Sequence, residues 1–177
     1  MATTYRLTPH EHVTVLRAEP ELLEVEGRWG AAGKPPPAHY HPEQDERFEV
    51  LEGRLRVLVG DEERELAAGE TVEIPRGVSH QMWNPSEAPA RALWQTRPAG
   101  RTEEWFRAID SLYTEGRLGA KGTPSALAFG ALLKEYGDVF RLGVGPEPVT
   151  RPLISLLGLL GRIRGYRPGR GSATGGG

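Results

Sequence analysis

Two histidines stand two residues apart in Gly33-Lys34-Pro35-Pro36-Pro37-Ala38-His39-Tyr40-His41, and the same pattern continues with Glu46 and Gly53. Successive side chains of a strand point to opposite faces, so an extended segment turns both imidazoles the same way. Glu46 has the same parity as Phe48 and Val50, and an apolar parity should face inward. The segment therefore predicts two histidines and a carboxylate directed into a β-structure.

A second cluster supplies a third histidine, and it comprises Gly69, Pro75, Gly77, His80 and Asn84. A single His-x-His pair is more often a surface or local hydrogen-bonding feature, but a buried carboxylate near histidines is costly without a cation. Three imidazoles and one carboxylate suit Fe, Mn, Ni, Cu, Zn or Co, whereas Ca and Mg prefer oxygen ligands. We therefore expect one divalent transition metal, of open identity, at His39, His41, Glu46 and His80.

Short alternating segments run from residue 13 to residue 97, and Gly, Pro, Asn or Asp closes each of them. Glu52-Gly53 and Gly60-Asp61 are the expected tight turns. Strands at regular spacing with turn signals between them are typical of an all-β sandwich or barrel.

Both clusters resemble the two motifs of the cupin superfamily, and specifically of its small, single-domain, conserved-barrel members. The first motif, Gly-x5-His-x-His-x4-Glu-x6-Gly, and the second, Gly-x5-Pro-x-Gly-x2-His-x3-Asn, match at every specified position. The resemblance implies an antiparallel jelly-roll barrel and metal ligation by His39, His41, Glu46 and His80. It is strong over residues 33–84, extends over 13–97 as a whole barrel, and says nothing about the residues after Arg101.

The pattern changes after Arg101, where helices are predicted over residues 102–113, 124–136 and 152–164. Residues 143–152 are a linker by composition, and the Gly-rich end is of low complexity. We expect a cupin barrel over residues 1–100, a mainly helical extension over 101–170 and a disordered tail over 171–177.

The last predicted helix is apolar first and basic last, from Leu153 to Arg164. The simpler interpretation is a helix packed on the barrel or on a partner chain, and the alternative is weak contact with an anionic membrane surface. The resemblance makes a homodimer the expected assembly.

Composition excludes several classes of protein. The chain has no cysteine, so disulfides and thiolate metal sites are excluded, and its net charge of −2 gives no reason to expect nucleic acid. No apolar run approaches the roughly 18 residues of a spanning helix, and residues 1–6 show no secretory signal. The expected location is the cytoplasm.

Several neighbouring polar residues have plainer interpretations. Glu43 and Asp45 are expected in a solvated acidic loop, with Asp45 as an alternative ligand if that loop shifts. His10 and His12 precede the barrel and are expected at the surface.

A metal in this scaffold does not specify the reaction. No strand arginine has a clear inward parity, so the expected ligand is a small apolar or aromatic molecule. Met82 and Trp94 have parities that allow them to line its pocket, although core packing explains them equally. The first hypothesis is a metal-dependent oxidoreductase of the quercetin-dioxygenase-like class, with Glu46 also accepting a proton. The alternative is a non-catalytic module that binds a metal or a small ligand as a sensor.

Overall fold

The computed structural model describes residues 2–119, 122–143 and 147–166. Its described strands are β1 (Thr4–Thr8), β2 (Glu11–Glu19), β3 (Leu22–Trp29), β4 (His39–Tyr40), β5 (Asp45–Glu52), β6 (Arg54–Val59), β7 (Glu62–Ala67), β8 (Thr71–Ile74), β9 (His80–Trp83), β10 (Ala90–Arg97) and β11 (Arg141–Leu142). Its helices are α1 (Thr102–Thr114), α2 (Ala126–Glu135) and α3 (Glu147–Ile163).

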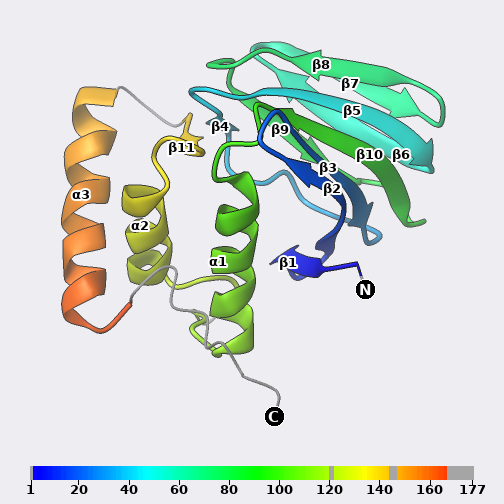
Figure 1. Ribbon diagram of the computed structural model, residues 1–177. Helices are drawn as coiled ribbons and strands as arrows, with labels where there is room; N and C mark the ends of the chain where they lie inside the picture. Colours follow the sequence, from blue (N-terminus) through cyan, green and yellow to red (C-terminus); the bar gives the residue numbers. More distant parts are fainter. Residues whose placement is uncertain (1, 120–121, 144–146, 167–177) are drawn as a thin grey trace.

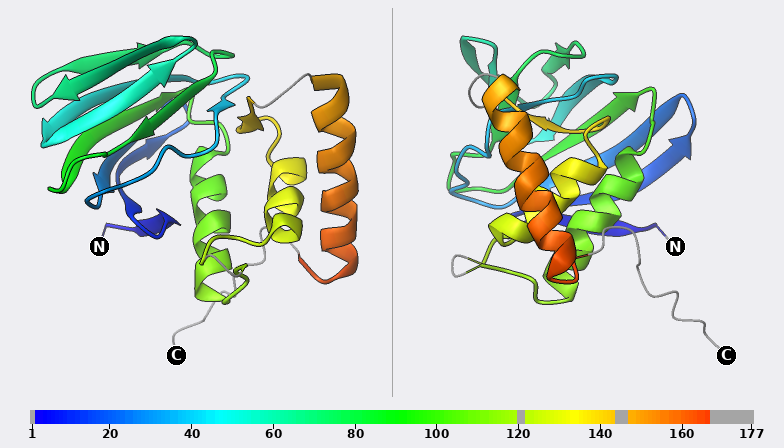
Figure 2. Two further views of the ribbon diagram at one scale, coloured as in Figure 1. Left: turned by 180° about the vertical axis from the view of Figure 1, so that it is seen from behind. Right: turned by 90° about the vertical axis from the view of Figure 1, so that its left-hand side faces the viewer.

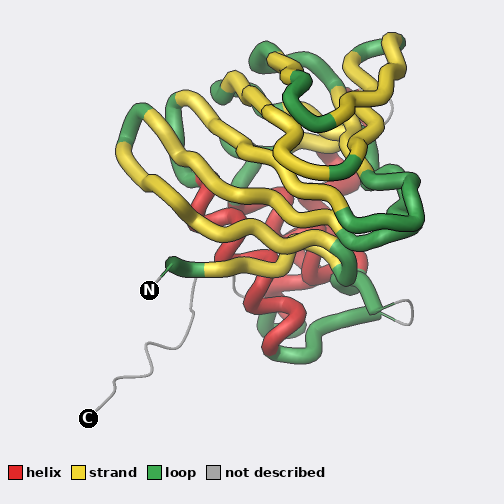
Figure 3. Tube along the Cα trace, turned by 90° about the vertical axis from the view of Figure 1, so that its right-hand side faces the viewer, coloured by secondary structure: helices red, strands yellow, loops and turns green. Residues whose placement is uncertain are grey.

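The strands form two antiparallel sheets that enclose the core, as Figures 1 and 3 show. One sheet has the order β1-β2-β3-β10-β5-β8 and the other has the order β11-β4-β9-β6-β7. Strand β10 illustrates the reason for this arrangement. Its buried residues alternate with more accessible ones, so one face of the strand packs on the core. The expected all-β jelly roll is confirmed.

The tight turn predicted at Gly60-Asp61 joins β6 and β7, whereas Glu52-Gly53 is a bend between β5 and β6, which belong to different sheets. Gly53 and Gly60 both have positive φ, at 76° and 58°. Gly53 is also confined, because a Cβ there would meet the carbonyl oxygen of Pro89 at 2.7 Å. Only glycine combines that backbone conformation with that close approach.

The three helices stand side by side next to one end of the barrel, with α1 nearest to it and α3 outermost (Figure 2). The prediction of a linker over residues 143–152 is wrong for its last part, because α3 already begins at Glu147 and contains Pro152. An internal proline removes one helical hydrogen bond, and packing against a neighbouring helix offsets that loss. The predicted disordered tail lies outside the described residues.

Glycines allow α2 and α3 to approach closely. A Cβ on Gly130 would meet the Cβ of Leu157 at 2.7 Å, and one on Gly161 would meet the carbonyl oxygen of Leu127 at 2.5 Å. Larger residues at these positions would push the two helices apart.

Helix α1 shares its core with the barrel. Trp105 and Phe106 are almost fully buried, and the Phe106 ring meets the Trp94 ring of β10 edge-on, with centroids 5.2 Å apart. The extension that the sequence motifs do not cover is therefore part of the hydrophobic core.

Helix α3 leaves an apolar stripe exposed, which consists of Leu153, Leu156, Leu160 and Ile163. Among the helices that the structure describes, none is long and apolar enough to cross a membrane.

We expect Phe106→Ala to lower the free energy of unfolding by about 3–5 kcal/mol, because it leaves a cavity between α1 and β10. Chemical denaturation followed by circular dichroism measures the change. The control is Leu16→Ala, an exposed leucine on β2, which should change stability by less than about 0.5 kcal/mol. Equal effects of the two substitutions would show that α1 does not share the barrel's core.

Candidate metal centre

Three histidines converge inside the barrel from two strands of one sheet. His39 lies in β4 and is the register partner of His80 in β9, while His41 follows β4 directly. Their potential ligand nitrogens all lie within 4.8 Å of one another. His41 and His80 are buried, and His39 is partly buried. The parity argument for His39 and His41 thus agrees with the observed arrangement.

Backbone carbonyls hold the other ring nitrogen of each histidine. His39 Nδ1 lies 3.0 Å from the Pro37 oxygen, His80 Nδ1 lies 3.1 Å from the Val78 oxygen, and His41 Nδ1 lies 2.6 Å from the Val139 oxygen. A carbonyl only accepts, so each Nδ1 must carry the proton and donate it. In the neutral rings the Nε2 atoms keep their lone pairs, as metal ligation requires.

Glu46 in β5 completes the cluster from the opposite sheet. Its Oε1 accepts a hydrogen bond of 2.9 Å from Trp94 Nε1 and lies 3.3 Å from His41 Nε2. Its Oε2 lies 3.1 Å from His80 Nε2. The carboxylate therefore points into the barrel, as strand parity predicted.

The cluster lacks the donors that its buried acceptors need. His41 Nε2 is buried without a hydrogen-bond donor, and the donor that the described part of the chain offers to the buried Glu46 Oε2 is His80 when it is protonated. Buried polar atoms in proteins are nearly always paired, and a divalent cation would pair both a bare imidazole nitrogen and a carboxylate oxygen. The donor set therefore fits a transition metal.

Burial, together with the neighbouring His80 and His41, lowers the pKa of His39 to about 3. Burial likewise lowers the pKa of His41. Burial alone would raise the pKa of Glu46, but His41 and His80 outweigh it and bring that pKa down to about 2. Near neutral pH the site thus holds an ionised carboxylate and at least two neutral imidazoles, which are the forms that bind metals.

Burial alone would lower the pKa of His80, but its hydrogen bond and ion pair with Glu46 outweigh burial and raise it. In the metal-free protein His80 and Glu46 therefore form an ion pair. A metal must displace the His80 proton in order to bind, because the same Nε2 cannot hold both.

The C-terminal extension contributes residues to this centre. The sequence analysis did not predict that contribution. Val139 provides the carbonyl for His41, and the Phe140 ring stacks on the His39 ring at a centroid distance of 4.5 Å. Strand β11 then pairs with β4, so that Leu142 lies opposite His39. No motif or periodicity in the sequence links these residues to the histidines, since nearly 100 residues separate them.

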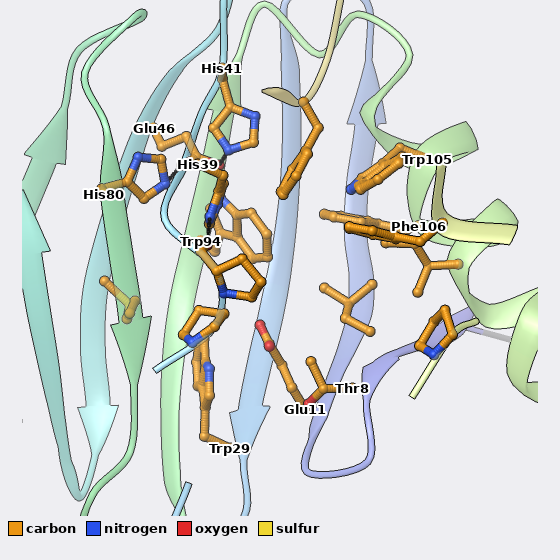
Figure 4. Close-up of a pocket in the computed structure, with 18 of the residues that line it drawn as sticks. Thr8, Glu11, Trp29, His39, His41, Glu46, His80, Trp94, Trp105 and Phe106 are labelled. Carbon is orange, nitrogen blue, oxygen red and sulfur yellow. Dashed lines mark hydrogen bonds and ion pairs between the residues drawn. The ribbon is translucent and has the colours of Figure 1, made fainter. Parts of the chain in front are cut away.

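A cavity of about 350 Å³ opens from the cluster toward the helices (Figure 4). Met82 and Trp94 line the cavity, as their strand parity allowed. Most of the other lining side chains are also apolar, and several come from the extension: Trp105, Phe106, Ile109, Phe129 and Phe140. Glu11 lines it as well and was missed, although it shares the parity of the buried Val13.

The remaining sequence candidates lie elsewhere. Asp45 accepts hydrogen bonds from the backbone N–H of Arg76, at 2.8 Å, and from its Nε, at 3.2 Å, so its carboxylate is engaged away from the cluster. Glu43 and His10 are exposed, and His12 accepts a hydrogen bond from Arg6 on the outer surface.

Comparison with known proteins agrees with this geometry. The family model described as a cupin domain matches residues 30–96. The tetracenomycin polyketide synthase protein TcmJ of Streptomyces glaucescens is 37% identical over 68 residues, which cover 38% of this chain and 46% of that protein. An oxidoreductase of Arthrobotrys oligospora is 40% identical over 53 residues, which cover 29% of this chain and 21% of that protein. The chain thus spans less than half the length of either curated relative.

Solved structures share the fold. An RmlC-like cupin from Shewanella frigidimarina superposes with a TM-score of 0.52 at 18% identity, covering 58% of this chain and 89% of the other. The TT1209 protein from Thermus thermophilus is 30% identical with a TM-score of 0.48, covering 52% and 89% of the two chains. The superposition on the RmlC-like cupin identifies the architecture of the barrel.

We expect Phe140→Leu to weaken zinc binding about 10-fold, because it removes the ring that stacks on His39 and holds its orientation. Competition with a chromophoric chelator measures the dissociation constant. The control is Phe129→Leu, which removes another aromatic ring from the cavity wall without touching a histidine. Equal affinities in all three proteins would contradict a supporting role for the extension.

Proposed function

We propose that this chain, which carries a domain of the cupin superfamily, is a metal-dependent oxidoreductase of the quercetin-dioxygenase-like class acting on a small apolar or aromatic molecule. The observation that carries the proposal is a cluster of three imidazoles and one carboxylate at the wall of an aromatic cavity. Such a cluster gives a buried metal direct access to a ligand.

His39, His41, His80 and Glu46 are the proposed ligands of one divalent transition metal. When bound, a redox-active metal with open positions supplies Lewis acidity and a site for substrate and dioxygen. The chain's own contribution is to hold His39, His41 and Glu46 in their deprotonated forms. The Nδ1 hydrogen bonds to backbone carbonyls fix the ring orientation.

Glu46 is also the proposed proton acceptor, at its Oε2. The indole of Trp94 occupies Oε1, whereas Oε2 has no hydrogen-bond donor besides a protonated His80 within the described residues. Against the opposing effect of burial, the contacts with His41 and His80 lower its pKa to about 2, so the carboxylate is ionised at neutral pH and becomes an effective proton acceptor when those contacts loosen.

The cavity supports an apolar or aromatic substrate. Its walls include the stacked pair Phe48 and Trp94, together with Phe106. Flat rings pack favourably against such walls. The names of the two relatives agree with this proposal, since one belongs to a polyketide synthase and the other is an oxidoreductase.

We expect protein purified without chelator to contain about one equivalent of iron, manganese, copper or nickel, and to consume dioxygen with a member of a panel of phenols and enols. His80→Ala should lose the metal, because it removes one ligand from a small set. Glu46→Ala should abolish turnover. Elemental analysis and an oxygen electrode measure both effects.

The control is His12→Ala, which removes a histidine from the outer surface and should change neither readout. Tightly held zinc without turnover would instead favour the non-catalytic binding module. A protein that binds no metal even after reconstitution would overturn the proposal.

We also propose that the chain forms a homodimer through α3. Leu153, Leu156, Leu160 and Ile163 are spaced by three, four and three residues, and each is at least 42% exposed. This is the spacing of a helix that packs against another helix, and a second copy offers the same stripe around a two-fold axis.

We expect Leu156→Glu combined with Leu160→Glu to convert the dimer into a monomer, because two carboxylates cannot be buried in an apolar seam. Light scattering after size-exclusion chromatography measures the mass. Leu16→Glu changes an equally exposed leucine on β2 and should leave the dimer intact. A wild-type monomer that sediments with anionic vesicles would contradict dimerisation and favour the membrane-surface alternative.

A further inference from the structure

Glu11 and Trp29 form a second polar position in the cavity, away from the histidines. They are register partners across β2 and β3, so their side chains share the inner face of the first sheet. Both line the same cavity as the histidines, and Figure 4 shows them at its lower end with the histidines at its upper end.

Trp29 presents an unused donor. The residue is 5% exposed, and its indole Nε1 has no hydrogen-bond partner among the described residues. The ring is held in place because Gly27 leaves room for it: a Cβ there would meet the Trp29 ring carbons Cη2 and Cζ3 at 2.5 and 2.7 Å. A buried N–H without an acceptor is costly, so this group requires a partner that the described chain does not provide.

Glu11 presents a carboxyl group at the same place. Its side chain is partly buried, and Figure 4 shows the carboxyl directed into the cavity. Burial, together with the charge of Glu46, raises the pKa of this carboxyl to about 7. Nothing in the metal cluster or in the core packing explains why an acidic residue stands here.

We propose that Glu11 and Trp29 bind a hydroxyl group at the far end of an elongated aromatic ligand whose other end carries the oxygen atoms that meet the metal. This inference deepens the proposed function and rests on it. It makes the ligand two-ended: polar at each end and flat and apolar between them.

A hydroxyl group fits both residues at once. Its oxygen accepts from the Trp29 N–H, and its proton is donated to the Glu11 carboxylate. An ammonium group would leave the Trp29 N–H unpaired because it has no acceptor. Above about pH 7, where Glu11 is ionised, a carboxylate would be repelled, so binding is tested at pH 8. The aromatic walls between the two ends, formed by Trp94, Phe106 and Phe140, match a flat ring system.

The test compares two probes, 3-hydroxyflavone and 3,4′-dihydroxyflavone, which share a metal-binding hydroxy-ketone and differ only in a hydroxyl at the far end. Zinc-loaded protein prevents turnover, so fluorescence titration measures binding alone. We expect the dihydroxy probe to bind about 5- to 25-fold more tightly, since each added hydrogen bond is worth about fivefold in affinity.

Glu11→Met and Trp29→Phe should each reduce this ratio by about fivefold, because each removes one hydrogen-bonding group and keeps the bulk of the side chain. The matched control is Glu19→Met on the same strand, whose carboxylate pairs with Arg17 at the surface, and it should leave the ratio unchanged. Equal affinities of the two probes for the wild type, or an unchanged ratio in both cavity variants, would overturn the proposal.

A stability measurement tests Glu11 without any ligand. Its pKa in the folded protein lies above the ordinary 4.5, so its favourable contribution is present below about pH 4.5 and is lost as the pH rises through about 7. Glu11→Gln should therefore melt at a higher temperature than the wild type at pH 8, and this advantage should shrink steadily toward pH 5. The substitution leaves the other ionisable groups that face the cavity in place, namely Tyr113, Glu46, His39, His41 and His80. An advantage that is the same at both pH values would show that the carboxyl is not enclosed, which removes the basis for the site.

The outcomes also separate this inference from the proposed function. If removal of zinc weakens both probes equally while their ratio persists, the far-end site stands independently of the metal. If zinc-loaded protein binds neither probe, the hydroxyl site is overturned, whereas the oxidoreductase proposal still depends on metal content and oxygen consumption.

Discussion

Inside the barrel, His41 and His80 turn their Nε2 atoms toward the Glu46 carboxylate, and His39 lies beside them in the same cluster. Each imidazole is oriented by a backbone carbonyl at Nδ1, so the lone pairs face inward and cannot be satisfied by rotating the rings. Acceptors that face one another in a buried site repel unless a cation or a proton stands between them. The barrel's two sheets, which bring the histidines from one side and Glu46 from the other, hold this arrangement in place.

The C-terminal extension also contributes to the orientation of these histidines. Strand β11 adds to the sheet beside β4, and this pairing places the Val139 carbonyl at His41 and the Phe140 ring against His39. Helix α1 then covers the cavity with Trp105 and Phe106. The same segment therefore orients two proposed ligands and encloses the space in front of them, which joins the metal cluster and the aromatic pocket into one site.

The cavity itself combines two environments. Around the histidines it is polar and strongly charged, and between the aromatic rings it is apolar. A single enclosed space with both properties selects ligands by shape as well as by charge, because a molecule must present its polar atoms where the wall does. This explains how a scaffold with a common metal cluster acquires its own ligand preference through the residues that line the rest of the cavity.

The sequence alone indicated an all-β sandwich or barrel, the inward direction of His39, His41 and Glu46, and the tight turn at Gly60-Asp61, while its resemblance to the cupins implied the jelly roll. These features are local, since strand parity and glycine's freedom at positive φ act over a few residues. Strand parity also predicted that Met82 and Trp94 could line the pocket. The same argument, applied to the parity of Val13, would have placed Glu11 on the inner face. Only the tertiary structure decided that Val139, Phe140, Trp105 and Phe106 complete the site. Val139 and Phe140 lie about 100 positions from the histidines that they contact, and all four residues reach the site because the extension folds back on the barrel, which no short-range pattern records.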